Sequence, residues 1–417
     1  MRLGWQTLWT VAALAIAMEI DAAVFEDDLA FLRQHTQLIV LNAPNGTAQV
    51  AVAPAWQGRV VTSSAQGAKG RSFGWINRKL ITSGQILQHF NPLGGEDRLW
   101  LGPEGGQFSV YFAKDAPFDL AHWYVPSAFD TQPFEVIERA DDRVAFQSSF
   151  ELTNYSGTHF QIRVRRTVRV LAPAMARAAL SIAPASDLAV VAYESNNTLI
   201  NAGSSRWTKD KGLLSIWILG MFNPSSTATI VIPIKPGSDS KLGKKTTSDY
   251  FGAIPTDRLR ETERAVFLRA DGQFRSKVGI NPKRSLGKLG SYDALNHVLT
   301  VVEFDQPPGV TDFVNSLWKI QSDPFAGDVA NAYNDGAPAP GVPPMGPFFE
   351  LESSSPAAAL APGQRLSHTH RTFHIIGPEA ELDTVSRTIL GLSLAEINTA
   401  FLPGTAAPSR TPTHPGT

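Results

Sequence analysis

The chain has 417 residues, with 37 Lys and Arg against 38 Asp and Glu, 43% hydrophobic and 18% charged residues, and no cysteine. This apolar content excludes a disordered chain, and the net charge of −1 argues against a nucleic-acid-binding protein, which usually carries a basic domain. The lack of cysteine excludes a disulfide scaffold, thiolate catalysis, Cys-ligated zinc and a lipoprotein anchor.

Residues 1–23 have the features of a signal peptide. Arg2 gives a positive start, residues 8–18 form an apolar run, and Asp21-Ala22-Ala23 supplies small residues at a cleavage point. The apolar run is shorter than the roughly 20 residues that a membrane-spanning helix needs. The alternative is a buried N-terminal helix. We therefore expect a periplasmic or extracellular protein without a membrane span, its mature chain beginning near residues 22–24.

The mature chain opens with a short helix and continues in strands. Phe25, Leu29 and Leu32 have helical spacing, and Asn45-Gly46 between two alternating segments is typical of a hairpin turn. Strands are predicted at 37–41, 48–52, 144–152, 159–170, 178–182, 213–219, 227–234, 265–269, 297–304 and 366–376.

Helices return only near the C-terminus. Gly377-Pro378 opens one that ends at Gly391, and Ser393 with Glu396 forms a capping box for another. No repeat of fixed period and no alternation of strand and helix is present. The sequence therefore predicts an all-β fold, a large antiparallel sandwich with a few short peripheral helices, as one domain over 24–403. Residues 404–417 are predicted to be a disordered tail.

Charged side chains are concentrated in a glycine-rich segment, residues 88–107, among aromatic and apolar neighbours. Buried charges must be paired or face a ligand, so this segment is a candidate binding site. The alternative is a turn with a structural Arg–carboxylate bridge. The candidate substrate-binding residues are His89, Asn91, Glu96, Arg98 and Glu104.

A second group combines carboxylates and imidazoles. Alternate residues of a strand share a face, so Glu350 lies with Glu352, and His368 with His370. We expect these segments to be neighbouring hairpin strands, which would make the group a general acid/base arrangement. A metal site, from the His-x-His spacing, and a solvated sheet face are the alternatives. We expect neither a stoichiometric metal nor another cofactor.

Amides and tryptophans form a third group, because amides bind hydroxyls and indole faces cover the C–H patches of a sugar ring. Its members are Asn197, Asn201, Trp207 and Trp217. Turn-forming Asn and core Trp are the alternative.

Two further features are a set of alternating arginines and an oxygen-rich segment. Arg163, Arg165 and Arg169 alternate with apolar residues and indicate a solvated strand face, whereas Arg166 is expected to be a buried partner of a carboxylate. Oxygen-bearing side chains at 328–335 suggest calcium but lack the EF-hand spacing.

Several motifs resemble a family of uncharacterised, exported bacterial proteins in the galactose mutarotase-like superfamily. They are residues 91–98, 101–106, 217–222, 249–252, 290–293, 333–336 and 350–356. The resemblance covers roughly residues 25–395 and implies a β-supersandwich with a sugar cleft on its concave sheet.

Aldose 1-epimerases of that superfamily use a glutamate base before a Pro-Gly turn, and the similar stretch here makes Glu352 the candidate base. The resemblance departs from their pattern at the acid histidine, because Thr198-Leu-Ile-Asn201 contains none. The acid would come from His368, His370 or His89.

The resulting hypothesis is a protein that binds a small sugar or glycan and has an aldose 1-epimerase-like activity. A non-catalytic glycan-binding module and a metal-dependent carbohydrate-active enzyme are the alternatives. The sharpest expectation is that Glu96, Arg98, Glu352 and His370 line one cleft, with Trp217 or Trp207 at its edge.

Overall fold

Alternating burial along the strands determines which side chains face the interior. The computed structural model describes residues 23–183 and 185–402. In β7 (His159–Val170), Phe160 and every second residue after it are buried, whereas Arg163 and Arg165 are exposed. Arg166 falls in the buried register and pairs with Asp97, so the predicted placement of these arginines is confirmed.

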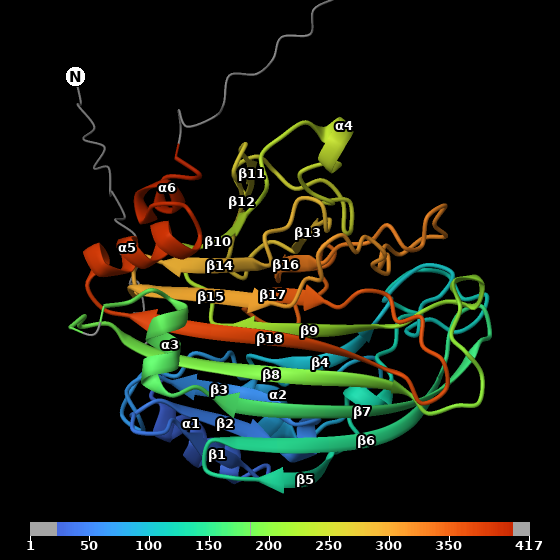
Figure 1. Cartoon of the computed structure of the whole chain (residues 1–417), viewed down its shortest axis with the longest axis horizontal. Helices are drawn as coiled ribbons and strands as arrows, with labels where there is room; N and C mark the ends of the chain where they lie inside the picture. Colours follow the sequence, from blue (N-terminus) through green and yellow to red (C-terminus); the bar gives the residue numbers. More distant parts are fainter. Residues whose placement is uncertain (1–22, 184, 403–417) are drawn as a thin grey trace, which may run out of the picture.

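The strands form three antiparallel sheets (Figure 1). The ten-stranded sheet contains, in spatial order, β11 (Leu259–Glu261), β12 (Ala265–Arg269), β10 (Ala228–Pro233), β14 (Lys288–Asp293), β15 (Val298–Phe304), β18 (Arg365–Ile376), β8 (Ala189–Asn201), β7, β6 (Arg143–Thr153) and β5 (Glu135–Arg139). The five-stranded sheet contains β13 (Ser276–Ile280), β16 (Ala330–Asn334), β17 (Phe349–Ser354), β9 (Ser215–Phe222) and β4 (Arg98–Gly102). The three-stranded sheet contains β1 (Ile39–Asn42), β2 (Gln49–Ala53) and β3 (Arg59–Ser64).

The main core lies between the ten-stranded sheet and the two smaller sheets. Ile230 and Val302 of the large sheet pack in one cluster with Leu351 of the five-stranded sheet. Val60 of β3 packs in another cluster with Val164 of β7. The predicted all-β sandwich is therefore confirmed as a fold class.

Short helices lie around the sheets. They are α1 (Phe25–Arg33), α2 (Arg78–Ser83), α3 (Pro173–Ala179), α4 (Asp239–Leu242), α5 (Glu379–Ile389) and α6 (Leu394–Asn398). Leu382 of α5 and Ile397 of α6 pack against Phe373 of β18, on the face of the ten-stranded sheet that points away from the main core. Figure 1 shows α5 and α6 at one end of the molecule. Within the described residues no helix is long and apolar enough to span a membrane.

Several local predictions are confirmed. Phe25, Leu29 and Leu32 are buried on α1, and β1 pairs with β2 across the turn at Asn45. Asn45 has a φ of 58°, which Asn adopts more readily than most residues. Ser393 and Glu396 form the expected capping box.

Two local predictions are wrong. Residues 178–182 are not a strand, because Pro173 opens an alanine-rich helix, α3, that continues to Ala179. Residues 349–354 and 366–376 are not a hairpin either, because β17 and β18 belong to different sheets.

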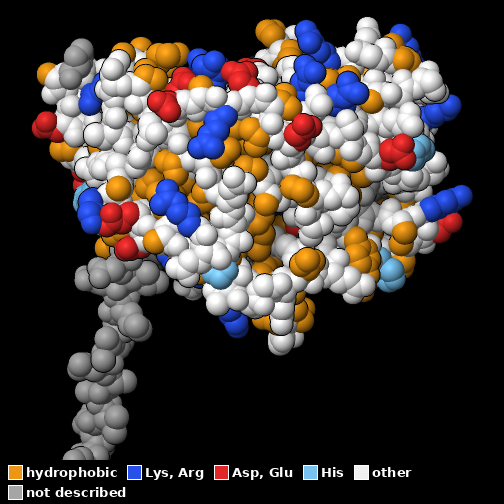
Figure 2. Space-filling model, turned by 90° about the horizontal axis from the view of Figure 1, so that it is seen from below, with side chains coloured by type: hydrophobic (Ala, Val, Ile, Leu, Met, Phe, Trp, Pro, Cys, Tyr) orange, Lys and Arg blue, Asp and Glu red, His pale blue; other side chains and the backbone are white. Residues whose placement is uncertain are grey.

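The surface carries no continuous patch of one charge in the view of Figure 2, where basic and acidic side chains are interspersed with apolar ones. The predicted signal peptide and tail fall on residues 1–23 and 404–417; apart from Ala23, they lie outside the described residues.

Candidate functional site

The face of the five-stranded sheet that points away from the main core carries aromatic and charged side chains. Period-2 alternation puts Trp100 of β4 beside Trp217 of β9, since the two residues are register partners. Tyr333 of β16 is the register partner of both Glu350 and Lys277. Five strands therefore bring residues that are far apart in the sequence onto one surface.

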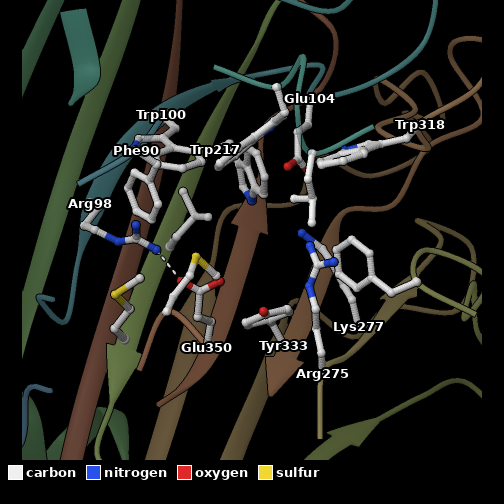
Figure 3. Close-up of a pocket in the computed structure, with 16 residues that line it drawn as sticks. Phe90, Arg98, Trp100, Glu104, Trp217, Arg275, Lys277, Trp318, Tyr333 and Glu350 are labelled. Carbon is white, nitrogen blue, oxygen red and sulfur yellow. Dashed lines mark hydrogen bonds and ion pairs between the residues drawn. The ribbon is translucent and has the colours of Figure 1, made fainter. Parts of the chain in front are cut away.

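Loops close over this face and turn it into a pocket (Figure 3). Its volume is about 530 Å³ when space open to solvent at the mouth is included. The lining residues are Phe90, Arg98, Trp100, Glu104, Leu120, Trp123, Trp217, Leu219, Met221, Phe251, Arg275, Lys277, Trp318, Tyr333, Met345 and Glu350. Mainly apolar walls with a few polar groups are typical of small-molecule sites.

Arg98 and Glu350 form an ion pair at this pocket, and both are almost fully buried. The pKa of Glu350 is raised to about 8, mainly by burial and in part by the nearby Glu352, while Arg98 and Lys277 counteract part of this increase. Glu350 therefore gains and loses a proton near neutral pH: its ionised form pairs with Arg98, and its protonated form can donate to a ligand.

Glu352 lies beneath the pocket rather than in its wall. It is fully buried, and its Oε2 accepts a hydrogen bond from Trp217 Nε1 at 2.9 Å and lies 3.1 Å from Lys277 Nζ. The Lys277 ammonium also lies 4.6 Å from the centre of a Trp217 ring. Burial lowers the pKa of Lys277, but Glu352, Glu104 and Glu350 outweigh this effect and the net pKa is raised.

Several buried polar atoms around the pocket have no hydrogen-bond partner in the described part of the chain. They are Arg98 Nε and Nη1, Trp100 Nε1, Trp123 Nε1 and Glu352 Oε1. Leaving such an atom unpaired costs about 1–3 kcal/mol. At this pocket these atoms are available to the hydrogen-bonding groups of a ligand.

Glu104 and Arg275 lie at the same pocket. Burial raises the pKa of Glu104, and Lys277 and Arg275 counteract part of this increase. The Arg275 guanidinium lies 3.6 Å from the centre of the Phe251 ring, which holds it against an aromatic wall.

Glu96 is not part of this pocket. Ser63 Oγ and Tyr193 OH donate to its Oε2 at 2.8 and 2.9 Å, and His374 Nε2 lies 3.1 Å away. This fully buried network lies in the interior between the sheets. The expectation that Glu96 shares a cleft with Arg98 is wrong.

His368 and His370 are also in the interior between the sheets. Each ring has a nitrogen 2.8 Å from Ser353 Oγ, and Ser353 points to the opposite face of β17 from Glu350 and Glu352. The prediction that these carboxylates face the histidines is therefore wrong. Burial lowers the pKa of His368 to about 3 and that of His370 to about 4, so both rings are neutral at neutral pH.

The predicted amide and tryptophan group does not converge on this pocket, although Asn201 and Trp207 line a separate hollow together. Asn197 Oδ1 accepts from Arg166 Nη1 at 2.7 Å, and Asn201 Nδ2 donates to backbone carbonyls. Trp207 packs edge-on against Phe160, at a ring distance of 5.3 Å. Of this group only Trp217 lines the pocket.

His89 and Asn91 support the pocket from behind. His89 Nδ1 donates to the Trp123 carbonyl at 2.7 Å, and Asn91 Nδ2 donates to Asp130 at 2.7 Å. These bonds hold the segment that presents Phe90 to the pocket. Their role in the structure is to position an aromatic wall.

The oxygen-rich segment 328–335 does not converge on one point. Asp328 accepts from Tyr250 OH at 2.7 Å, and Asp335 accepts from Tyr333 OH at 2.6 Å. No group of three or more His, Asp or Glu in residues 23–183 and 185–402 is placed to hold a metal ion.

Several pocket residues were not among the candidate residues predicted from the sequence. They are Trp100, Trp123, Phe251, Arg275, Lys277, Trp318 and Tyr333. A signal exists for two of them, since Phe251 and Tyr333 lie in motifs that carry the family resemblance. Lys277 is a charged residue in β13, a strand whose residues are all buried. A charge within such a strand is a second signal of a functional residue. Trp123 and Trp318 come from long loops whose course the strand pattern does not define.

Solved structures similar to this chain include the Slr1438 protein from Synechocystis sp. PCC 6803, with 13% identity, a TM-score of 0.47, and coverage of 82% of this chain and 96% of that one. A galactose mutarotase-like protein from Lactobacillus casei ATCC 334 has 12% identity, a TM-score of 0.46, and coverage of 81% and 100%. A galactose mutarotase related enzyme from Lactobacillus acidophilus has 10% identity, a TM-score of 0.43, and coverage of 81% and 97%. A search of curated proteins found no match.

A family model matches residues 23–401, nearly the whole described chain, and its description is "Family of unknown function (DUF6786)". The chain belongs to this family.

Proposed function

We propose that the pocket on the five-stranded sheet binds a carbohydrate. The observation that carries the proposal is the set of unpaired buried polar atoms of Arg98, Trp100 and Glu352 at a pocket walled by aromatic rings. A sugar offers hydroxyl groups to such atoms and C–H faces to such rings.

Binding can be measured by isothermal titration calorimetry against neutral and acidic monosaccharides and short glycans. Replacing a half-buried wall residue, Trp318→Ala, is expected to weaken binding at least about fivefold, because central aromatic contacts at interfaces commonly contribute more than 1 kcal/mol. Trp56→Ala is the matched control, since Trp56 is also half-buried but packs near α1. Equal affinities of wild type and Trp318→Ala would show that the sugar binds at a site other than this pocket.

As an activity for this site we propose acid/base chemistry at the sugar ring, as in anomer interconversion. Two carboxyl groups on one face of β17 support it: Glu350, whose pKa burial raises to about 8, and Glu352, whose carboxylate is held by Lys277. Glu350 would protonate the ring oxygen while Glu352 takes the proton of the anomeric hydroxyl. The sugar must then displace the pocket floor enough to reach Glu352 Oε1.

Exchange between anomers, followed by NMR saturation transfer, tests this activity. Glu352→Gln is expected to abolish the exchange and retain binding, because it removes the base but keeps its shape. Exchange at the wild-type rate in that variant would exclude Glu352 as the base.

A further inference from the structure

The three cations of the pocket are not equally paired. Arg98 forms an ion pair with Glu350, and Lys277 forms one with Glu352. Arg275 lines the same pocket and is only half-buried, and no carboxylate in the described residues lies within ion-pair distance of its guanidinium. One pocket cation therefore has no fixed anionic partner.

Arg275 is held in a position to meet a ligand. It precedes β13 by one residue and lies two positions from Lys277, so the two side chains leave the strand on the same side. The guanidinium lies over Phe251 at 3.6 Å, and Figure 3 shows Arg275 and Lys277 extending into the pocket below Glu104. This stacking fixes the guanidinium plane. Burial raises the pKa of Tyr333, and Arg275 opposes this increase through its charge and a side-chain hydrogen bond, so Arg275 also contacts the Tyr333 hydroxyl.

Several acidic residues lie near this end of the pocket. Burial raises the pKa of Glu350, Glu104 and Asp335, which favours their uncharged forms, and Arg275 counteracts part of this increase at Glu104 and Asp335. Lys277 remains charged, because its acidic neighbours raise its pKa. Arg275 and Lys277 therefore bring two cations to one end of the pocket, and only Lys277 is in an ion pair within the described residues.

Resting on the proposed carbohydrate function, we infer that the ligand is an anionic sugar whose carboxylate, sulfate or phosphate group is bound by Arg275, with Lys277 beside it. A planar guanidinium donates two parallel hydrogen bonds to two oxygens of such a group. The aromatic walls would hold the rest of the ring.

The test compares matched pairs of sugars by calorimetry at constant ionic strength. Each pair contains a neutral hexose and an acidic derivative: glucose with glucuronate, glucose 6-sulfate and glucose 6-phosphate, and galactose with the corresponding derivatives. A charge-assisted contact of this kind predicts that the acidic member binds about 10- to 100-fold more tightly. The acidic derivative whose affinity exceeds that of its neutral sugar by the largest factor identifies the anionic group.

Two variants assign the preference to Arg275. Arg275→Gln is expected to reduce the ratio of acidic-sugar to neutral-sugar affinity to less than about threefold, whereas Arg275→Lys should retain part of this preference. Arg163→Gln, an exposed change on β7, is the control and should behave as wild type.

The outcomes separate the two proposals. Equal affinity for neutral and acidic partners, or a preference that survives Arg275→Gln, overturns the inference and leaves the carbohydrate pocket standing. Failure of every sugar in both series to bind overturns the carbohydrate pocket and the inference together.

Discussion

Individual residues at the site differ sharply in how burial affects their charge. Glu350 is an acid that the fold keeps partly protonated, and His368 and His370 are bases that the fold keeps neutral. Both effects follow from desolvation, which disfavours the charged form of any group. They have opposite consequences for stability as a function of pH.

Glu350 should make the protein less stable as the pH rises. Its pKa is about 8 in the folded state and near 4.5 in the unfolded state, so between these values the folded state binds more protons. The free energy of unfolding should therefore fall as pH rises, by up to about 1.4 kcal/mol per pH unit. Urea unfolding at pH 6.5 and 8 should show a smaller decrease for Glu350→Gln. An equal decrease in both proteins would contradict the assignment.

The buried histidines should make the protein less stable as the pH falls. Their pKa values of about 3 and 4 lie below the unfolded value of 6.5, so the unfolded state binds more protons between pH 6.5 and 4. His370→Gln should lose less stability than wild type between these pH values, in urea unfolding, and should still bind sugar. His35→Gln, at an exposed position, is the control. Loss of sugar binding in His370→Gln with an unchanged fold would show that His370 takes part in the binding site.

At the scale of elements, strand alternation explains both what the sequence predicted and what it missed. The pattern predicts that Glu350 and Glu352 share a face, which the structure confirms, because period 2 is a local property of one strand. It does not determine which strand lies opposite. β17 and β18 are consecutive strands but lie in separate sheets, so the predicted encounter of Glu352 with His370 does not occur. Partner choice depends on the long loops, which carry no periodic signal.

A buried ion pair couples elements of different sheets. Arg166 of β7 donates to Asp97 Oδ1 at 2.6 Å and to the Gly58 carbonyl at 3.0 Å, and both charged side chains are fully buried. Asp97 immediately precedes β4, so this arginine connects the ten-stranded sheet to the pocket sheet.

Removing this arginine should strongly destabilise the protein. Arg166→Met leaves a buried carboxylate unpaired and should lower the free energy of unfolding by about 3–5 kcal/mol. Asp97→Asn in the same background should recover part of that loss, since it removes the unpaired negative charge. Arg163→Met, on the exposed face of β7, should cost little. A double variant as unstable as the single one would show that charge is not the cause.

At the scale of the whole molecule, the described chain is anchored from its first residues. Ser72 N donates to the Ala23 carbonyl at 2.8 Å, and Phe25 N donates to the Gly70 carbonyl at 2.9 Å. For the exported chain that we propose, a mature protein that began at residue 22 or 23 would keep both bonds, and one that began at Val24 would keep the bond of Phe25.

N-terminal sequencing of protein from the producing cell tests the proposed export. The expected first residue lies among Ala22, Ala23 and Val24. Mature protein that retains Met1 and remains in the cytoplasm would contradict it.

The strand order beneath the pocket also governs how the protein reaches its folded state. Leu219 of β9 is the register partner of Arg98 on one side and of Glu352 on the other, so contacts across more than a hundred residues of chain define the site. Topologies dominated by such distant contacts fold slowly, because large loops must close before the contacts form. During synthesis β4 emerges long before β9, with an unpaired edge. The site therefore forms late, and a nascent chain that ends before β17 has no pocket.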